Sequence, residues 1–135
     1  MGVGTDLWNR FEAMLVKQDY DGWVSLFAGD AVYIDPGGRH EGLEAIRAWC
    51  DEWGPAFSDV SIDTSLVVEQ GDVVIAEYVY RATHTGPLTM PNGSVVPATG
   101  KTSDTPVVTI LRVDDGKIVA GRDYFDSKMG LSAGT

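Results

Sequence analysis

Cysteine, histidine and basic residues are all scarce in this sequence of 135 residues. The single cysteine, Cys50, excludes an intrachain disulfide and a thiolate metal cluster. The two histidines, His40 and His84, are distant in sequence, and no spacing of carboxylates fits a known metal site. The sequence therefore predicts no metal site, and we expect a protein that works without a cofactor.

Positive charge and long apolar runs are also lacking. Lysine and arginine number 10 against 20 acidic residues, so the net charge is −10. This charge disfavours nucleic acids and anionic membrane surfaces as partners, because both would be repelled. No run approaches the roughly 20 apolar residues of a membrane span. Asp6, Arg10 and Glu12 interrupt the N-terminal stretch where a signal peptide needs apolar residues, so we expect a soluble, cytoplasmic protein.

The first third of the chain has the pattern of helices. The length suits one domain over residues 1–135, with residues 130–135 expected as a flexible tail. Trp8, Phe11 and Leu15 form an apolar stripe at helical spacing, and Thr5 is the expected N-cap. A shorter helix is predicted from about residue 21, and a third helix from residue 42 or 43 to residue 54. A short strand is predicted at residues 31–35 between them.

The remainder of the chain has the pattern of an antiparallel sheet. Strands are predicted at residues 60–69 and 73–85, joined by a tight turn at Gln70-Gly71-Asp72. A second pair, at residues 99–113 and 118–126, is joined by Asp114-Asp115-Gly116-Lys117. Residues 86–98, with two glycines and three prolines, are predicted to be mostly loop. Helices followed by long antiparallel strands indicate the α+β class.

Alternation along the strands predicts which polar side chains share a face. Tyr33 and Asp35 share one face of the first strand, Tyr80 and His84 one face of the 73–85 strand, and Asp123 lies on one face of the last strand. A curved sheet wrapped around helices would direct these five residues into an apolar pocket. An apolar pocket with a few converging polar groups is typical of a small-molecule site.

Three stretches carry a resemblance to a known family. They are LFAGDAVYIDP with HEGLEAIR (residues 26–36 and 40–47), THTGP with PATGK (83–87 and 97–101), and DGKIV with RDYFD (115–119 and 122–126). In order and spacing they resemble the nuclear-transport-factor-2-like superfamily and, within it, the SnoaL-like enzymes, from Trp8 to Asp126. The resemblance implies a cone in which three N-terminal helices pack on a strongly bent, mostly antiparallel sheet. It also implies a homodimer through the outer sheet face, where Val73, Ile75 and Val79 are expected.

The catalytic residues of these families match only in part. Asp35 resembles the general base of ketosteroid isomerases, but Phe11 and Val108 stand where those enzymes carry a tyrosine and a protonated aspartate. Tyr33 and Asp123 resemble the water-positioning tyrosine and the base of limonene-epoxide hydrolases, whose other acid and arginine are absent. In the comparison with polyketide cyclases, the position of their catalytic aspartate falls near Thr109 in this sequence. His84 lies in the His-Thr-Gly sequence that resembles those enzymes. The resemblance implies a family-like pocket with a hybrid catalytic set.

The leading hypothesis is a cofactor-independent acid–base enzyme, a cyclase or isomerase, acting on a small to medium hydrophobic oxygenated molecule. The candidate catalytic residues are Asp35, Asp123, Tyr33, Tyr80 and His84, and the candidate substrate-binding residues are Tyr78, Trp49, Trp53, Phe11 and Phe125. One alternative is an epoxide hydrolase or epoxide-opening cyclase that uses Asp123 with Tyr33. The other is a non-catalytic ligand-binding or interaction domain.

Simpler structural roles stay open for several of these residues. Asp35 could have the purely structural role of accepting hydrogen bonds from the backbone of the following loop. Asp123 could form an ion pair with Arg39 or Arg47. His84 could be a rim residue at a strand end, and His40, in a polar glycine-rich loop, is expected to be solvated.

Overall fold

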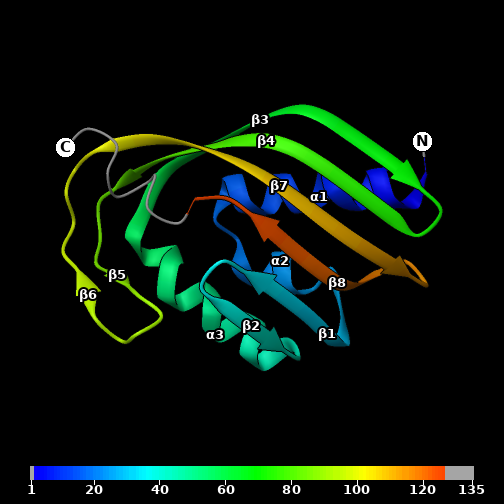
Figure 1. The fold of residues 1–135 in the computed structure, drawn as a ribbon, viewed down its shortest axis with the longest axis horizontal. Helices are drawn as coiled ribbons and strands as arrows, with labels where there is room; N and C mark the ends of the chain where they lie inside the picture. Colours follow the sequence, from blue (N-terminus) through cyan, green and yellow to red (C-terminus); the bar gives the residue numbers. More distant parts are fainter. Residues whose placement is uncertain (1, 127–135) are drawn as a thin grey trace.

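A curved sheet of six strands forms the body of the protein (Figure 1). The computed structural model describes residues 2–126. In the order β2-β1-β8-β7-β4-β3, β1 and β8 are parallel and all other neighbours are antiparallel. The strands are β1 (Phe27–Asp35), β2 (Gly38–Glu41), β3 (Phe57–Gln70), β4 (Val73–His84), β7 (Thr102–Asp114) and β8 (Lys117–Tyr124). Two short strands, β5 (Leu88–Thr89) and β6 (Val95–Val96), form a separate hairpin.

The helices lie on the concave side of the sheet, where the long strands arch over α1 (Figure 1). They are α1 (Val3–Lys17), α2 (Tyr20–Val24) and α3 (Leu43–Trp53), and a 3₁₀ turn, η1 (Gly54–Ala56), follows α3. No helix among the described residues is long and apolar enough to cross a membrane. Three N-terminal helices on a mostly antiparallel, curved sheet confirm the predicted α+β fold.

Aromatic side chains fill the space between the helices and the sheet. The stripe of α1 is buried as predicted, with Trp8 and Phe11 each 1% exposed. The ring of Trp8 lies 5.0 Å from that of Tyr78 on β4, and the ring of Phe11 lies 5.2 Å from that of Trp23 on α2. Offset and edge-on contacts at these separations add to the gain from burying apolar area. The core therefore fixes α1 and α2 against the inner face of the sheet.

Several predicted boundaries differ from the structure. Helix α1 begins at Val3, and Thr5 is not its cap: the Thr5 hydroxyl and amide donate to Glu69 Oε1 on β3, at 2.7 and 2.9 Å. The chain does not stop at Pro36 but turns back at once into β2, which the prediction missed. The predicted loop at 86–98 contains the β5–β6 hairpin, and β7 begins at Thr102 rather than 99. The tail predicted at 130–135 lies outside the described residues.

Candidate functional site

A cavity of about 330 Å³ opens between the inner face of the sheet, α1 and α3. The β5–β6 hairpin contributes Leu88 to Pro91 to its wall, close to the β1–β2 turn. A Cβ atom on Gly37 would come within 2.8 Å of Pro91 Cγ, so hairpin and turn are in contact. All five predicted substrate-binding residues line the cavity: Phe11, Trp49, Trp53, Tyr78 and Phe125. Their role as substrate contacts stays a prediction.

Asp123 is the centre of a hydrogen-bond network in the cavity wall. Its Oδ1 accepts a bond from the Tyr33 hydroxyl at 2.5 Å and another from Thr109 Oγ1 at 2.7 Å. Thr109 Oγ1 also lies 2.8 Å from the Tyr78 hydroxyl. Because the Thr109 hydroxyl donates its only hydrogen to Asp123, the Tyr78 hydroxyl is the donor in its contact with Thr109. The chain of bonds thus runs from Tyr78 through Thr109 to Asp123, with Tyr33 donating to the same oxygen.

The strands explain how these side chains meet. Asp123 on β8 is the antiparallel partner of Thr109 on β7, so their side chains lie on the same face of the sheet and bond each other. Tyr33 comes from β1, where it is paired with Gly121 of β8. A Cβ atom at Gly121 would lie 2.3 Å from Cε2 of Tyr33, so the tyrosine ring can cross β8 to reach Asp123 only because this residue is glycine.

The surroundings of Asp123 shift its proton affinity. Burial raises the pKa of Asp123 from 3.8 to about 7, the bonds from Tyr33 and Thr109 lower it, and the nearby charge of Asp35 raises it again. Burial also raises the pKa of Tyr33 and of Tyr78 well above the usual value for tyrosine, and the charge of Asp123 adds to both. The two phenols therefore stay protonated donors, while Asp123 exchanges a proton near neutral pH.

Asp35 lies beside Asp123 on the neighbouring strand. The parallel register ends with Tyr33 opposite Gly121 and Ile34 opposite Arg122, so each aspartate directly follows the last pair. The charge of Asp35 acts on Asp123. Asp35 Oδ2 accepts a long bond of 3.3 Å from the amide of Gly37, which is the predicted loop contact. The cavity therefore has two adjacent carboxylates on one wall.

His40 is not solvated, contrary to expectation. Strand β2 pairs it with Tyr33 and brings its Nε2 to 2.9 Å from Asp35 Oδ1. Its ring stacks on Trp49 with the centroids 4.6 Å apart, and only 17% of its side chain is exposed. The prediction failed because it treated the chain after Pro36 as an open loop rather than as a returning strand.

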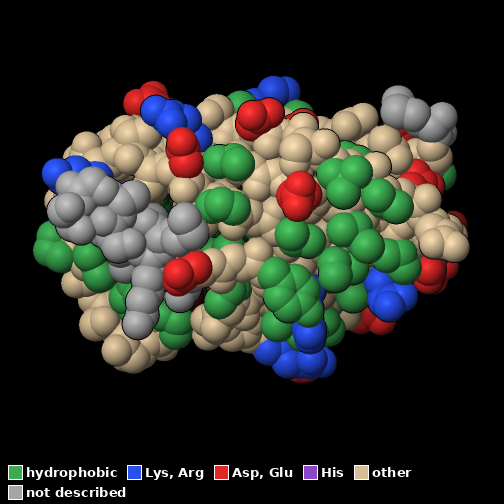
Figure 2. All heavy atoms as spheres, turned by 45° about the horizontal axis from the view of Figure 1, so that its top comes forward, with side chains coloured by type: hydrophobic (Ala, Val, Ile, Leu, Met, Phe, Trp, Pro, Cys, Tyr) green, Lys and Arg blue, Asp and Glu red, His purple; other side chains and the backbone are tan. Residues whose placement is uncertain are grey.

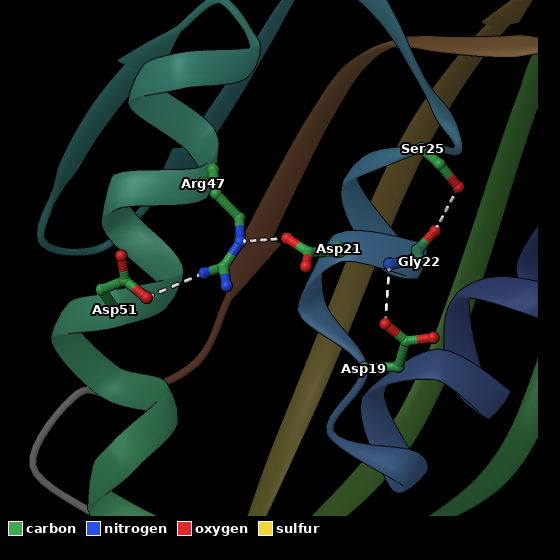
Figure 3. Close-up of polar contacts among 6 residues, drawn as sticks. All are labelled: Asp19, Asp21, Gly22, Ser25, Arg47 and Asp51. Atoms are coloured by element: carbon green, nitrogen blue, oxygen red, sulfur yellow. Dashed lines mark hydrogen bonds and ion pairs between the residues drawn. The ribbon is translucent and has the colours of Figure 1, made fainter.

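The ion pair considered for Asp123 does not form with either arginine. Arg47 on α3 instead bonds Asp21 of α2 and Asp51 of its own helix, each at 2.8 Å (Figure 3). Arg39 bonds Glu41 at 2.7 Å. Among the described residues no group of three or more histidines, cysteines or acids could hold a metal ion. Asp123 therefore interacts with two hydroxyls, and Asp35 with an imidazole and the amide of Gly37.

Two other predicted catalytic residues lie away from this network. Tyr80 lines the cavity from β4, but in the described structure its buried hydroxyl has no hydrogen-bond partner. His84, 1% exposed, is not among the cavity-lining residues: its Nδ1 lies 3.2 Å from Thr99 Oγ1 and its ring 5.6 Å from that of Phe57. It is a buried strand-end residue rather than a rim residue. A catalytic role for either stays a prediction.

Residues 8–121 match the SnoaL-like domain family. The chain belongs to the SnoaL-like family. Membership supports cofactor-free isomerase or cyclase chemistry at the level of the family, without a substrate. No curated protein has a significant sequence match to this SnoaL-like chain.

Solved structures of this fold superpose over nearly the whole chain. A protein from Jannaschia sp. CCS1, provisionally assigned as a SnoaL-like polyketide cyclase, has a TM-score of 0.81 and 20% identity over 96% of this chain and 92% of its own. IdmH from Streptomyces antibioticus, provisionally assigned as a polyketide cyclase, has a TM-score of 0.73 and 23% identity over 95% of each chain. A protein with a ketosteroid isomerase-like fold from Catenulispora acidiphila DSM 44928, solved with trimethylamine, has a TM-score of 0.76 and 22% identity over 93% and 88%. At these identities the likeness shows the fold alone.

Proposed function

We propose that this protein is an acid–base enzyme that moves a proton on a small to medium hydrophobic molecule containing a carbonyl group. The observation that carries the proposal is Asp123, whose carboxyl lies in the cavity wall with a pKa of about 7. A general base is most effective when its pKa lies near the pH at which it works. Asp123 meets this condition because it is buried beside a second carboxylate.

The proposed step begins with Asp123 as a carboxylate. It takes the proton from the carbon next to the carbonyl, and the electron pair of that bond moves onto the carbonyl oxygen as an enolate. In a ketone with a β,γ double bond, isomerisation follows if Asp123 returns the proton at the γ-carbon. Cyclisation follows if the enolate carbon attacks a second carbonyl of the molecule, whose oxygen then takes the proton from Asp123. Tyr33 and Thr109 keep Asp123 in one orientation during the transfer, since both donate to the same oxygen.

Deuterium uptake in heavy water tests this proposal without knowledge of the natural substrate. The probe is 4-phenylbutan-2-one, and proton NMR follows the loss of its α-hydrogens. We expect the wild type to accelerate exchange and Asp123→Asn to abolish the acceleration. Asp30→Asn is the matched control, since Asp30 is exposed and does not line the cavity. A wild-type rate equal to the buffer rate across a panel of hydrophobic ketones would favour the non-catalytic ligand-binding domain instead.

A second candidate reaction is the opening of an epoxide by water. The direct bond of 2.5 Å between Tyr33 and Asp123 favours it, because a water-positioning tyrosine and a base must be neighbours in that mechanism. The test is hydrolysis of 1-methylcyclohexene oxide in water enriched in ¹⁸O. Label in the diol that disappears in Asp123→Asn supports hydrolysis, and a fully active Asp123→Asn protein excludes it.

We also propose that the protein forms a homodimer through the outer face of the sheet. Figure 2 shows hydrophobic side chains gathered on one face of the molecule. Strand pairing places Ile75, Val68 and Ile110 in one row across the outer face, and Val68 is 44% exposed. Leu66, at 50%, and Tyr124, at 51%, extend this surface. A second copy would cover an apolar area that a monomer leaves in water.

A further inference from the structure

Three donors in the cavity wall are buried and have no hydrogen-bond partner in the part of the chain that the structure describes: the hydroxyl of Tyr80, Nε1 of Trp53 and Nε1 of Trp23. The ring of Trp23 lies 5.6 Å from that of Tyr33, which bonds Asp123, so the Trp23 donor belongs to the carboxylate end of the cavity. The other two donors, on Tyr80 and Trp53, lie further from Asp123. A buried donor that bonds nothing destabilises the folded protein, so such groups need an explanation. An acceptor atom on a bound molecule would provide one.

Tyr80 lies at the opposite end of the cavity from Asp123. The partner of Asp123 on β7 is Thr109, which in turn pairs with Ala76 on β4. Tyr80 is four residues further along β4, which corresponds to about 13 Å of strand. Burial is the main reason why the pKa of Tyr80 is raised, and the next is the nearby Tyr20. For Tyr33 and Tyr78 that second cause is Asp123.

Trp53 belongs to the same end as Tyr80. Its ring meets that of Tyr20 edge-on with the centroids 5.1 Å apart. The ring centroid of Trp49 lies 5.6 Å from that of Trp53 and 5.2 Å from that of Tyr33, the residue that bonds Asp123. A row of aromatic rings thus connects the unpartnered donors of Tyr80 and Trp53 with the carboxylate end. Such a row suits the apolar middle of a ligand that spans the cavity.

We propose that Tyr80 and Trp53 form a second, oxygen-binding end of the cavity. The ligand class is an elongated hydrophobic molecule with an oxygen function at each end. One end is the carbonyl whose neighbouring carbon faces Asp123, and the other is a carbonyl or ether oxygen that accepts from Tyr80 or Trp53. The reacting end rests on the proposed function, whereas the oxygen-binding end rests on the unpartnered donors of Tyr80 and Trp53.

The experiment compares two ketones of the same shape by isothermal titration calorimetry. The diketone 4-(4-acetylphenyl)butan-2-one has an oxygen at each end, whereas 4-(4-isopropylphenyl)butan-2-one lacks the second one. We expect the wild type to bind the diketone about tenfold more tightly, the effect of one additional hydrogen bond. In Tyr80→Phe the preference should fall to about two- to threefold, because Trp53 remains as a donor. In Tyr80→Phe combined with Trp53→Phe the preference should disappear.

Tyr20→Phe is the matched control, since Tyr20 carries the same hydroxyl next to this site but does not line the cavity. It should keep the tenfold preference. Stability gives an independent readout: Tyr80→Phe removes a hydroxyl that bonds nothing, so its urea unfolding midpoint should equal or exceed that of the wild type. Tyr20→Phe loses the bond that its hydroxyl accepts from Gln18 Nε2, at 3.3 Å.

Three results would overturn the inference. They are equal affinity of the wild type for the two ketones, an unchanged preference in the double variant, and no binding of either ketone at millimolar concentration. A lower midpoint for Tyr80→Phe would show that the hydroxyl has a structural partner. The proposed function is tested separately: a protein that prefers the diketone but does not exchange α-hydrogens binds as inferred without the proposed chemistry.

Discussion

Replacing Asp123 with asparagine should change how the stability of the protein depends on pH. The folded state raises the pKa of this carboxyl from 3.8 to about 7, so folding disfavours its charged form. The corresponding stability is present below pH 4, where the carboxyl is protonated in both states. It is lost progressively between pH 4 and pH 7, because the unfolded chain gains from ionisation and the folded protein does not. The difference between the two pKa values corresponds to as much as about 4 kcal/mol.

Asparagine is a close mimic of the protonated carboxyl. Its side-chain oxygen can still accept from Tyr33 and Thr109, and it carries no charge at any pH. We therefore expect similar stability for Asp123→Asn and the wild type at pH 4. By pH 8 the variant should be more stable than the wild type by as much as about 4 kcal/mol.

The assay is urea unfolding followed by tryptophan fluorescence at several values from pH 4 to pH 8. The quantity of interest is the difference between variant and wild type, because the other carboxylates titrate in both proteins and cancel. Asp30→Asn, at an exposed residue outside the cavity, serves as the control for replacing an aspartate with asparagine. A constant difference for Asp123→Asn would refute the reasoning, since it would mean that Asp123 titrates alike in the folded and unfolded states.

Three further changes test other parts of the structure. Gly37→Ala places a Cβ 2.8 Å from Pro91 Cγ, so it should displace the β5–β6 hairpin and speed hydrogen exchange at the amides of that hairpin. Unchanged exchange would contradict the contact. Thr109→Val removes the bonds to Asp123 and Tyr78, and urea unfolding should show a loss of about 1–3 kcal/mol; full stability would mean that these bonds are replaced. Ile75→Lys should give a monomer in light scattering if the outer sheet face joins two copies, and an unchanged mass would argue against that interface.

Local patterns predicted much of the fold. Gly71 in one turn and Asp115 and Gly116 in the other have positive φ angles, and each turn joins a pair of strands, as expected. Alternation along the strands placed Tyr33, Asp35 and Asp123 on the side that faces the cavity. These features could be predicted because turn chemistry and side-chain direction depend only on neighbouring residues.

Contacts between distant parts of the chain could not be predicted in this way. The parallel pairing of β1 with β8 joins residues near 33 to residues near 121 and has no local signal. Strand β2 has only four residues, too few to show a period, so the contact of His40 with Asp35 was missed. The bond from Thr109 to Asp123 could not be predicted from the turn either: the register at Asp114–Lys117 alone would pair Thr109 with Arg122, and an irregularity between Arg112 and Val113 shifts the pairing to Asp123.

The most direct test of the account is an NMR titration of the Asp123 side chain. The carboxyl carbon of aspartate is labelled with ¹³C and followed from pH 3 to pH 9, and the Asp123 signal is assigned by its absence in Asp123→Asn. We expect a titration midpoint near pH 7, together with a shift of the Tyr33 signals over the same range, because the Tyr33 hydroxyl donates to this carboxylate. A midpoint near pH 4 would contradict it, since Asp123 would then be an ordinary carboxylate with no means of exchanging a proton at neutral pH.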